Sequence, residues 1–143
     1  MRFFLFFVLI TTSASALAQS AIDHQKAAKS SLDAELSREG HDCPGVKTTL
    51  EENGCIVGIW EQTQKSLNSF FSALTDLLPA SDAHKLAEAQ KAWLSYRELS
   101  CNAIDNFYVG GTIRLSVATR CRIELSRSRM RDLDDLYNTV LHH

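Results

Sequence analysis

Apolar residues recur at intervals of three and four along most of the chain, which is the period of an amphipathic α-helix. The clearest run spans residues 49–78 and contains Ile56, Ile59, Trp60, Leu67, Phe70, Phe71, Leu74, Leu77 and Leu78. Thr49-Leu50-Glu51-Glu52 has the form of a capping box at its start, and Pro79 ends it. Gly54 and Gly58 weaken the first turns, which allows a break in the helix there.

The same period predicts a second helix over about 82–107, with Ser81 or Asp82 as its N-cap. Its inward face is predicted to comprise Leu86, Ala89, Trp93, Tyr96, Ser100 and Ile104. Gly110-Gly111 ends this helix, and the β-branched segment 112–118 is expected to be an ordered loop. A last helix follows over about 119–141, with apolar positions at Ile123, Leu125, Met130, Leu133, Leu136, Tyr137 and Val140.

Residues 21–39 predict a more loosely held N-terminal helix, because apolar residues are sparse there (Ile22, Leu32 and Leu36). Gly40 ends it, and the segment 41–45 is a turn-rich link. The chain has no Rossmann or P-loop pattern and no internal repeat. We therefore predict an all-α fold, a small helical bundle of three core helices plus a looser N-terminal helix.

The first eighteen residues have the order of a secretory signal peptide: Arg2, a short apolar run, and Ala16-Leu17-Ala18 before a cleavage point. The alternative is a membrane anchor, but a spanning helix needs about 20 mostly apolar residues and this run has about ten. We expect cleavage after Ala18 and release into the periplasm or the medium, with no membrane anchor left. The mature chain then has 125 residues, enough for one domain.

The four cysteines, Cys43, Cys55, Cys101 and Cys121, all lie in the predicted mature part. An even number in an exported chain predicts two disulfides, with three possible connectivities. A zinc site is the alternative, but no pair has the close C-x-x-C spacing of zinc ligands, so we expect no metal. The layout of the helices favours Cys43–Cys55 and Cys101–Cys121, which makes the bundle disulfide-stapled.

Charge and residue placement argue against two classes of function. The mature chain would have 14 basic and 17 acidic residues, a net charge of about −3, which does not suit a nucleic-acid binder. It permits a cationic protein partner. The five histidines lie in links, helix starts or the C-terminal tail, and none stands beside a nucleophile as a catalytic dyad requires. We expect no catalytic residues, no enzyme activity and no cofactor.

The segment 86–101 carries the most specific motif of the chain. It reads L-x-x-A-Q-x-x-W-x-x-Y-R-x-x-x-C, with Leu86, Ala89, Gln90, Trp93, Tyr96, Arg97 and Cys101 at the defined positions. With the cysteines, Leu67-Asn68 and the element Arg129–Leu133, it resembles the LprI-like lysozyme-inhibitor family of exported bacterial proteins. The resemblance covers residues 43–136. The helix at 21–39 lies outside it, and the position of a lipid-box cysteine is empty.

We therefore divide the chain into three parts: the signal peptide 1–18, an N-terminal helix and link over 19–42, and an LprI-like helical domain over 43–141, of which only the last rests on the resemblance. It implies a periplasmic binding protein that inhibits lysozyme. The alternative is an interaction or structural module of the envelope with the same fold and another envelope protein as partner. The sequence leaves open whether the bundle dimerises through an exposed apolar strip.

Two groups of residues are candidates for a binding site. Gln90, Trp93, Tyr96 and Arg97 share one helix; we interpret Trp93 and Tyr96 as core, Gln90 as an interhelical hydrogen-bond partner, and Arg97 as a tie to a carboxylate such as Glu124. The loop with Gly110, Gly111, Thr112 and Arg114 is the better binding candidate, since a disulfide would pin it. Lysozyme cleaves with two carboxylates in a cleft, and Arg114 would pair with one of them. The loop as a plain connection is the alternative.

Overall fold

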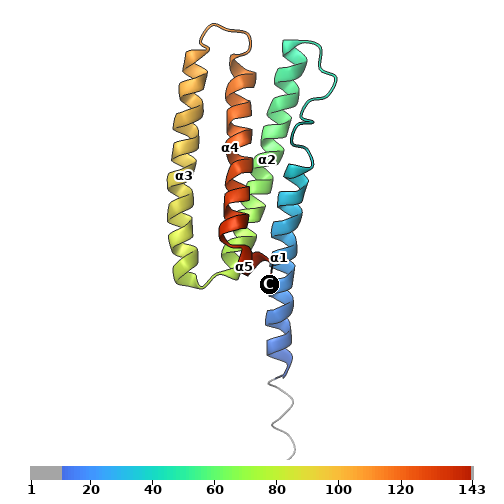
Figure 1. Ribbon diagram of the computed structural model, residues 1–143, viewed down its shortest axis with the longest axis vertical. Coiled ribbons are helices and arrows are strands. Elements are labelled where there is room, and N and C mark those ends of the chain that lie inside the picture. Colours follow the sequence, from blue (N-terminus) through green and yellow to red (C-terminus); the bar gives the residue numbers. More distant parts are fainter. Residues whose placement is uncertain (1–10, 143) are drawn as a thin grey trace, which may run out of the picture.

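The computed structural model describes residues 11–142, which form helices and connecting turns without a strand in that range. The helices are α1 (Thr11–Leu36), α2 (Thr49–Leu77), α3 (Ala80–Phe107), α4 (Arg114–Leu136) and the short α5 (Asn138–Leu141). The four long helices alternate in direction; α4 lies between α3 and α2, and α1 packs on α2 (Figure 1). The predicted all-α bundle is confirmed.

The N-terminal helix is part of the core, so the prediction of a loosely held helix was wrong. Ala28 and Leu32 of α1 are buried in the same apolar cluster as residues of α2, α4 and α5. The members of this cluster are Ala28, Leu32, Leu67, Phe70, Ala73, Leu74, Leu86, Met130, Leu133 and Leu141. The apolar period of α1 is sparse because a third inward position, Glu35, is a buried carboxylate rather than an apolar residue.

The start of α2 differs from the predicted capping box by one residue. Thr48, not Thr49, is the N-cap: its Oγ1 accepts from the Glu51 amide at 3.2 Å, and the Glu51 carboxylate accepts from the Thr48 amide at 3.1 Å. Both pairs have the S/T-x-x-E form, and only the backbone geometry selects between them. The helix then continues through Gly54 and Gly58 without a break.

The ends of α3 and α4 also correct the sequence prediction. The N-cap of α3 is Pro79, and the helix begins without a side-chain cap. Ser81 and Asp82 already lie inside the first turn, where the Asp82 amide donates to the Pro79 carbonyl at 2.9 Å. α4 begins at Arg114, so the expected loop over 112–118 is helical in its second half. Ser116, Ala118 and Thr119 are buried there, and tertiary burial outweighs the weak helical propensity of this segment.

The inward face of α3 is rotated from the predicted one. Leu86 is buried as expected, but its buried partners are Gln90, Arg97 and Cys101, while Tyr96 and Ala89 are exposed. Polar side chains with bonding partners therefore take core positions that the apolar pattern assigned to their neighbours.

Two disulfides join the elements, Cys43–Cys55 with Cα atoms 5.7 Å apart and Cys101–Cys121 at 5.6 Å. This is the connectivity that the predicted layout favoured. The first ten residues of the predicted signal peptide lie outside the described residues, and the rest belong to the part of α1 that extends beyond the bundle (Figure 1). Across residues 11–142 the helices fall short of the length and apolarity needed to span a membrane.

Candidate functional site

The motif residue Arg97 lies buried between three helices. Its guanidinium stacks over Trp60 of α2 and Trp93 of its own helix, 4.7 and 5.3 Å from the ring centroids. The same group donates to Gln64 Oε1 at 2.6 Å and to Ser126 Oγ at 3.1 Å. A planar guanidinium suits this place because it offers donors at its edge and a face for aromatic rings. Arg97 thus ties α3 to α2 and α4.

The carboxylate that balances Arg97 is Glu98, and the expected pairing with Glu124 was wrong. Glu98 accepts from Arg97 at 3.0 Å and from Arg122 of α4 at 3.0 Å. Burial lowers the pKa of Arg97. Burial also acts to raise the pKa of Glu98, but the hydrogen bonds from Arg122 and Arg97 outweigh it, so this pKa lies below its ordinary value.

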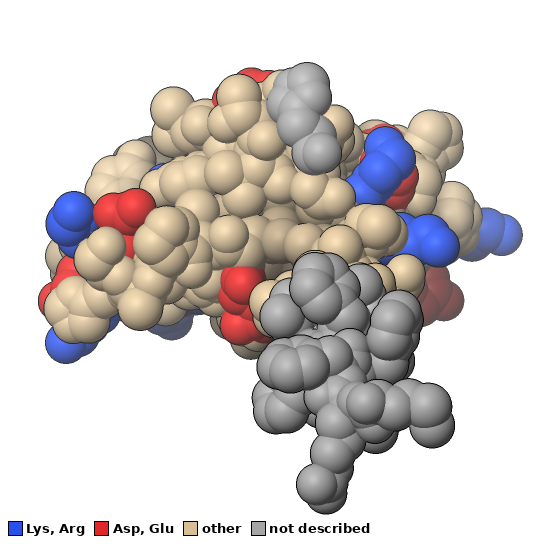
Figure 2. Space-filling view, turned by 90° about the horizontal axis from the view of Figure 1, so that it is seen from below, with Lys and Arg blue, Asp and Glu red and all other residues tan. Residues whose placement is uncertain are grey.

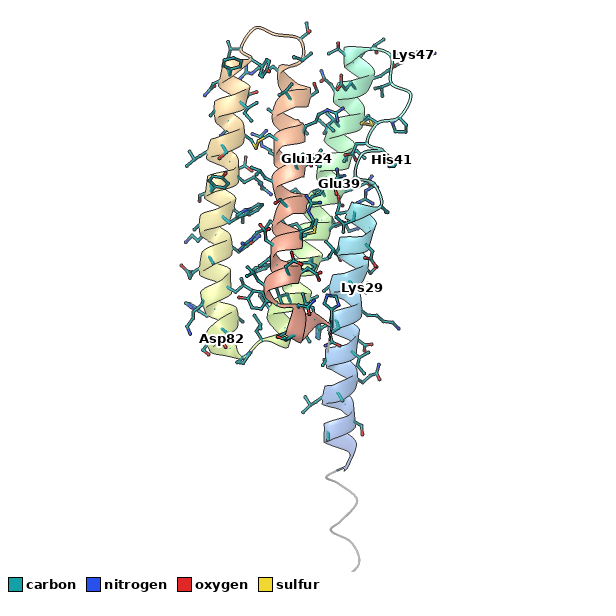
Figure 3. All side chains as sticks on the ribbon, viewed as in Figure 1. Lys29, Glu39, His41, Lys47, Asp82 and Glu124 are labelled. Atoms are coloured by element: carbon teal, nitrogen blue, oxygen red, sulfur yellow. A yellow bond between two sulfur atoms is a disulfide. The ribbon has the colours of Figure 1, made fainter. Side chains whose placement is uncertain are left out.

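Glu124 lies on α4 (Figure 3), two residues after Arg122 in the sequence. It approaches Arg127 of its own helix at 3.5 Å. Helical spacing explains why Glu124 does not pair with Arg97. Arg122 faces α3 through Glu98, and a residue two positions later on the helix points away from that face.

Gln90 and Trp93 complete this cluster on α3. Gln90 accepts a hydrogen bond from Arg129 Nε of α4 at 3.0 Å, and the Arg129 guanidinium lies 5.7 Å from the Trp93 centroid. Burial lowers the pKa of Arg129. The cluster of Trp60, Gln90, Trp93, Arg97 and Arg129 is thus turned inward and joins helices, which leaves little of it for a ligand to contact. Tyr96 stands apart from it on the exposed side.

A second buried polar cluster, which the sequence analysis missed, connects α1 to α4. Arg127 and Glu35 have no exposed side-chain surface, and Arg127 Nε lies 3.4 Å from a Glu35 oxygen. Thr63 of α2 donates to the same carboxylate at 2.9 Å, and Arg38 pairs with its other oxygen. The period of α4 contained the signal, because position 127 follows the buried Ile123 by four residues.

Asp42 closes this cluster from the link between α1 and α2. It accepts two bonds from Arg127, at 2.5 and 2.9 Å, in the bidentate geometry that makes such pairs strong. The bonds that Arg127 donates to Asp42 raise the pKa of Arg127 and outweigh the effect of burial, which lowers it. A nearby surface pair adds to the connection, since Arg131 of α4 donates at 2.7 Å to Glu39 (Figure 3). The second cluster therefore fixes α1 and the link on the bundle.

Within residues 11–142, no three histidine, cysteine, aspartate or glutamate side chains lie together as a metal site would require. Two of the histidines contact carboxylates at the surface: His24 lies 3.5 Å from Asp76, and His142 lies 2.9 Å from Asp134.

The turn between α3 and α4 is an exposed apolar feature at one end of the bundle. Val109, Ile113 and Leu115 are exposed there, and we call these three residues the tip. Gly110 has φ +84°, a conformation that other residues rarely adopt, and the Gly111 amide donates to the Tyr108 carbonyl at 2.9 Å. Of the predicted loop residues, Gly110, Gly111 and Thr112 lie in this turn, whereas Arg114 is the first residue of α4.

The Arg114 side chain, although partly exposed, already pairs with a carboxylate of its own chain. Its Nε donates to Asp105 Oδ1 at 2.8 Å, and its terminal nitrogen makes a second bond to the other oxygen. These bonds lower the pKa of Asp105 and raise that of Arg114. Together with the Cys101–Cys121 disulfide, the pair spans the base of the turn and holds the tip in one conformation.

The opposite end of the bundle carries an open groove of about 420 Å³. It is lined mainly by apolar side chains: Leu78, Pro79, Asp82, Lys85, Leu86, Ala89, Tyr137 and Val140. Seen from below, this end shows mostly uncharged side chains, with lysines and arginines toward its rim (Figure 2). The groove contains no cluster of polar groups that would orient a small ligand.

Comparison of the sequence with known proteins identifies one family. Residues 42–133 match the family model described as Lysozyme inhibitor LprI, a range that includes both disulfides, the Arg97 cluster and the tip, but not α1. The chain is 28% identical over 85 residues to Uncharacterized protein R02472 of Rhizobium meliloti (strain 1021). That alignment covers 59% of this chain and 58% of the relative. No solved structure matches.

Proposed function

The chain belongs to the family of the lysozyme inhibitor LprI, since the family model matches residues 42–133, and from this premise we propose an exported, non-catalytic protein that inhibits lysozyme. The tip at the α3–α4 turn is the contact surface in this proposal. The observation that carries it is that Val109, Ile113 and Leu115 are exposed on a turn whose base is closed by a disulfide and an ion pair.

A convex tip of this kind suits the concave cleft of an enzyme. Binding clefts are lined mainly by apolar side chains, and a preordered segment loses little conformational entropy when it enters one. Leu50, at the start of α2 on the same end of the bundle, is also exposed. The predicted net charge of about −3 for the mature chain favours approach to a cationic partner.

Arg114 has a positioning role in this proposal. Its guanidinium is already bound to Asp105, so pairing with a carboxylate of the lysozyme cleft would require that pair to open. Arg114→Ala is expected to weaken inhibition by loosening the turn, and Asp105→Asn should weaken it similarly. Undiminished inhibition by Arg114→Ala would remove Arg114 from the site.

A turbidity assay with purified, oxidised protein against c-, g- and i-type lysozymes tests the function. Val109→Asp and Ile113→Asp are expected to reduce inhibition at least about tenfold, the loss of about 1.4 kcal/mol of contact energy. Leu136→Asp is the control, because Leu136 is also apolar, is even more exposed than Val109 and Ile113, and lies at the far end of α4. Inhibition that is insensitive to both tip variants would contradict the assignment of the tip.

The second candidate is an interaction module of the envelope without lysozyme activity. It is favoured by the same exposed tip, which fits any protein with a complementary apolar cleft. Absence of inhibition against all three lysozyme classes would support this candidate. Cross-linking in envelope extract, with Ile113→Asp as the negative control, would then identify the partner.

Export is proposed through cleavage after Ala18. The side chains of residues 14–20 are exposed, whereas His24 pairs with Asp76 at 3.5 Å and Gln25 donates to the Val140 carbonyl at 2.8 Å. Cleavage after Ala18 would leave these two contacts between α1 and the bundle in place. Mass spectrometry of the exported protein tests this, and an intact Met1 would contradict it.

A further inference from the structure

One exposed face of α3 is apolar from residue 89 to the end of the helix at Phe107. Exposed side chains follow one another at intervals of three and four residues, at Ala89, Ala92, Tyr96, Leu99, Ala103 and Phe107. Tyr96 is 57% exposed, Leu99 73% and Phe107 82%. We call these six residues the seam. Their spacing is that of a helix that packs along another helix.

The fold itself does not use the seam. α3 lies at the edge of the bundle and packs mainly on α4 (Figure 1). The face that it buries carries Leu86, Gln90, Arg97 and Cys101 and lies on a different side of the helix. A regular apolar pattern on the outer side of an edge helix is unusual for a solvated surface, where polar residues are expected.

Free charges beside the seam are confined to its first turn, where Glu88 and Lys91 are exposed. Between residues 92 and 107 the charged residues are Arg97, Glu98 and Asp105, and each is bound to a residue of its own chain. The other polar residues beside the seam are uncharged: Ser95, Asn102 and Asn106. Depletion of free charge is the compositional mark of the centre of a protein interface.

The order of residues along the seam is complementary to itself. When a second α3 is placed antiparallel, with the two-fold axis near residue 98, Ala92 lies opposite Ala103 and Tyr96 lies opposite Leu99. The same register places Phe107 level with Glu88 and next to Ala89, so the large ring meets the small side chain of Ala89 beside a carboxylate. Lys85, Glu88 and Lys91 then lie away from their own copies, and no like charges meet at the centre.

We propose that the seam is a homodimer interface in which α3 packs antiparallel against α3 of a second copy. At the observed exposures, the two aromatic rings each contribute roughly 100–200 Å². With Leu99 and the alanines, each copy buries about 600 Å², which is at the low end for specific interfaces. We therefore expect a weak, reversible dimer.

Sedimentation velocity of the oxidised mature protein, from about 1 μM to about 1 mM, tests the dimer. The wild-type protein should shift from monomer to dimer across this range. Leu99→Asp should weaken the dimer at least about tenfold, with an unchanged circular dichroism spectrum. Leu50→Asp is the control: Leu50 is as exposed as Phe107 but lies outside the seam, and this variant should dimerise like the wild type. A wild-type protein that stays monomeric at about 1 mM overturns the proposal, as does Leu99→Asp that dimerises unchanged.

A charge-pair experiment tests the antiparallel register. Ala92→Glu and Ala103→Lys should each weaken the dimer about tenfold, because a charge then faces an apolar partner. The double variant should recover to within about threefold of the wild type, since Glu at 92 meets Lys at 103 of the second copy. In a parallel pair the double variant would bring like charges together. Recovery therefore supports the register, and a double variant weaker than either single one overturns it.

Discussion

Arg127 holds a full charge at a position without exposed side-chain surface. Together with the apolar contacts of Ala28 and Leu32, its bond to Glu35 attaches α1 to the bundle. Its partners are Glu35 in α1 and Asp42 in the link, both far from it in the sequence. A buried ion pair of this kind is weak evidence for added stability, but the loss of one partner leaves an uncompensated buried charge. Arg97 has the equivalent place between α2, α3 and α4.

Arg127→Met is expected to destabilise the protein by about 3–5 kcal/mol, because Asp42 loses its bidentate partner and the buried Glu35 loses one of the two arginines that balance its charge. Urea unfolding followed by circular dichroism measures this. Arg131→Met is the matched control, since Arg131 lies on the same helix as Arg127 but forms a partly exposed pair with Glu39. This variant should lose less than about 1 kcal/mol of stability. Equal effects of the two substitutions would contradict the importance of the buried cluster.

Glu98 gives the interface of α3 and α4 a pH dependence. Its pKa is lowered in the folded protein, because hydrogen bonds from Arg122 and Arg97 outweigh burial. Stability from such a group is present above the unfolded pKa of about 4.3 and is lost as the pH falls through the lower, folded value. Glu98→Gln should therefore be less stable than the wild type at pH 7. The difference should shrink below pH about 4, as measured by urea unfolding across pH, and a difference that does not change with pH would contradict this account.

At the scale of elements, the ends of the helices depend on local bonds that the residue pattern defines only approximately. Thr48 and Thr49 both precede a glutamate by three residues, and the backbone selects Thr48 as the cap. The Glu51 carboxylate accepts from the amides of Lys47 and Thr48, and these bonds lower its pKa. α4 shows the opposite case, since burial of Ser116 and Thr119 extends the helix where local propensity would end it.

Thr48→Ala is expected to cost about 1 kcal/mol of stability, because the Glu51 amide loses its side-chain acceptor. Thr49→Ala is the control in the same turn and should change stability by only a few tenths of a kcal/mol. Thermal unfolding of the two variants compares them directly. A larger loss for Thr49→Ala would place the cap where the sequence pattern had predicted it.

At the scale of the whole molecule, the two disulfides secure different parts of the bundle. Cys101–Cys121 joins α3 to α4 below the tip, and Cys43–Cys55 joins the link to α2. The seam lies on α3, whereas the tip lies in the turn after α3 and at the start of α4, so Leu99 and Ile113 allow dimerisation and inhibition to be separated by substitution. Inhibition should fail with the Ile113 variant and dimerisation with the Leu99 variant.

Replacement of Cys101 and Cys121 by alanine should lower stability by about 3 kcal/mol, as the chain-entropy model gives for a loop of this length. It should also weaken inhibition, because the tip loses its closed base. The Cys43–Cys55 double alanine variant should be destabilised by a similar amount while it inhibits normally at temperatures where it is folded. Calorimetry and the turbidity assay measure the two effects, and equal loss of inhibition in both variants would contradict the role given to the tip.

The sequence by itself determined the helical class, the approximate helices, the favoured cysteine pairing and the family. These follow from short-range signals: apolar spacing, breakers such as Pro79, and a motif within sixteen residues. The sequence did not predict hydrogen-bond partners on other helices. Arg97 is the example, because it bonds to Gln64 and Ser126 and not to the expected Glu124.

Only the tertiary structure decided how each helix is rotated and which polar groups enter the core. It brought Glu35 to Arg127 across 92 residues of chain, and so made α1 part of the core. It also turned Tyr96 and Leu99 to solvent and left the seam uncovered. The physical reason is that apolar spacing defines a stripe on one helix, whereas the direction of that stripe depends on neighbours that are distant in sequence.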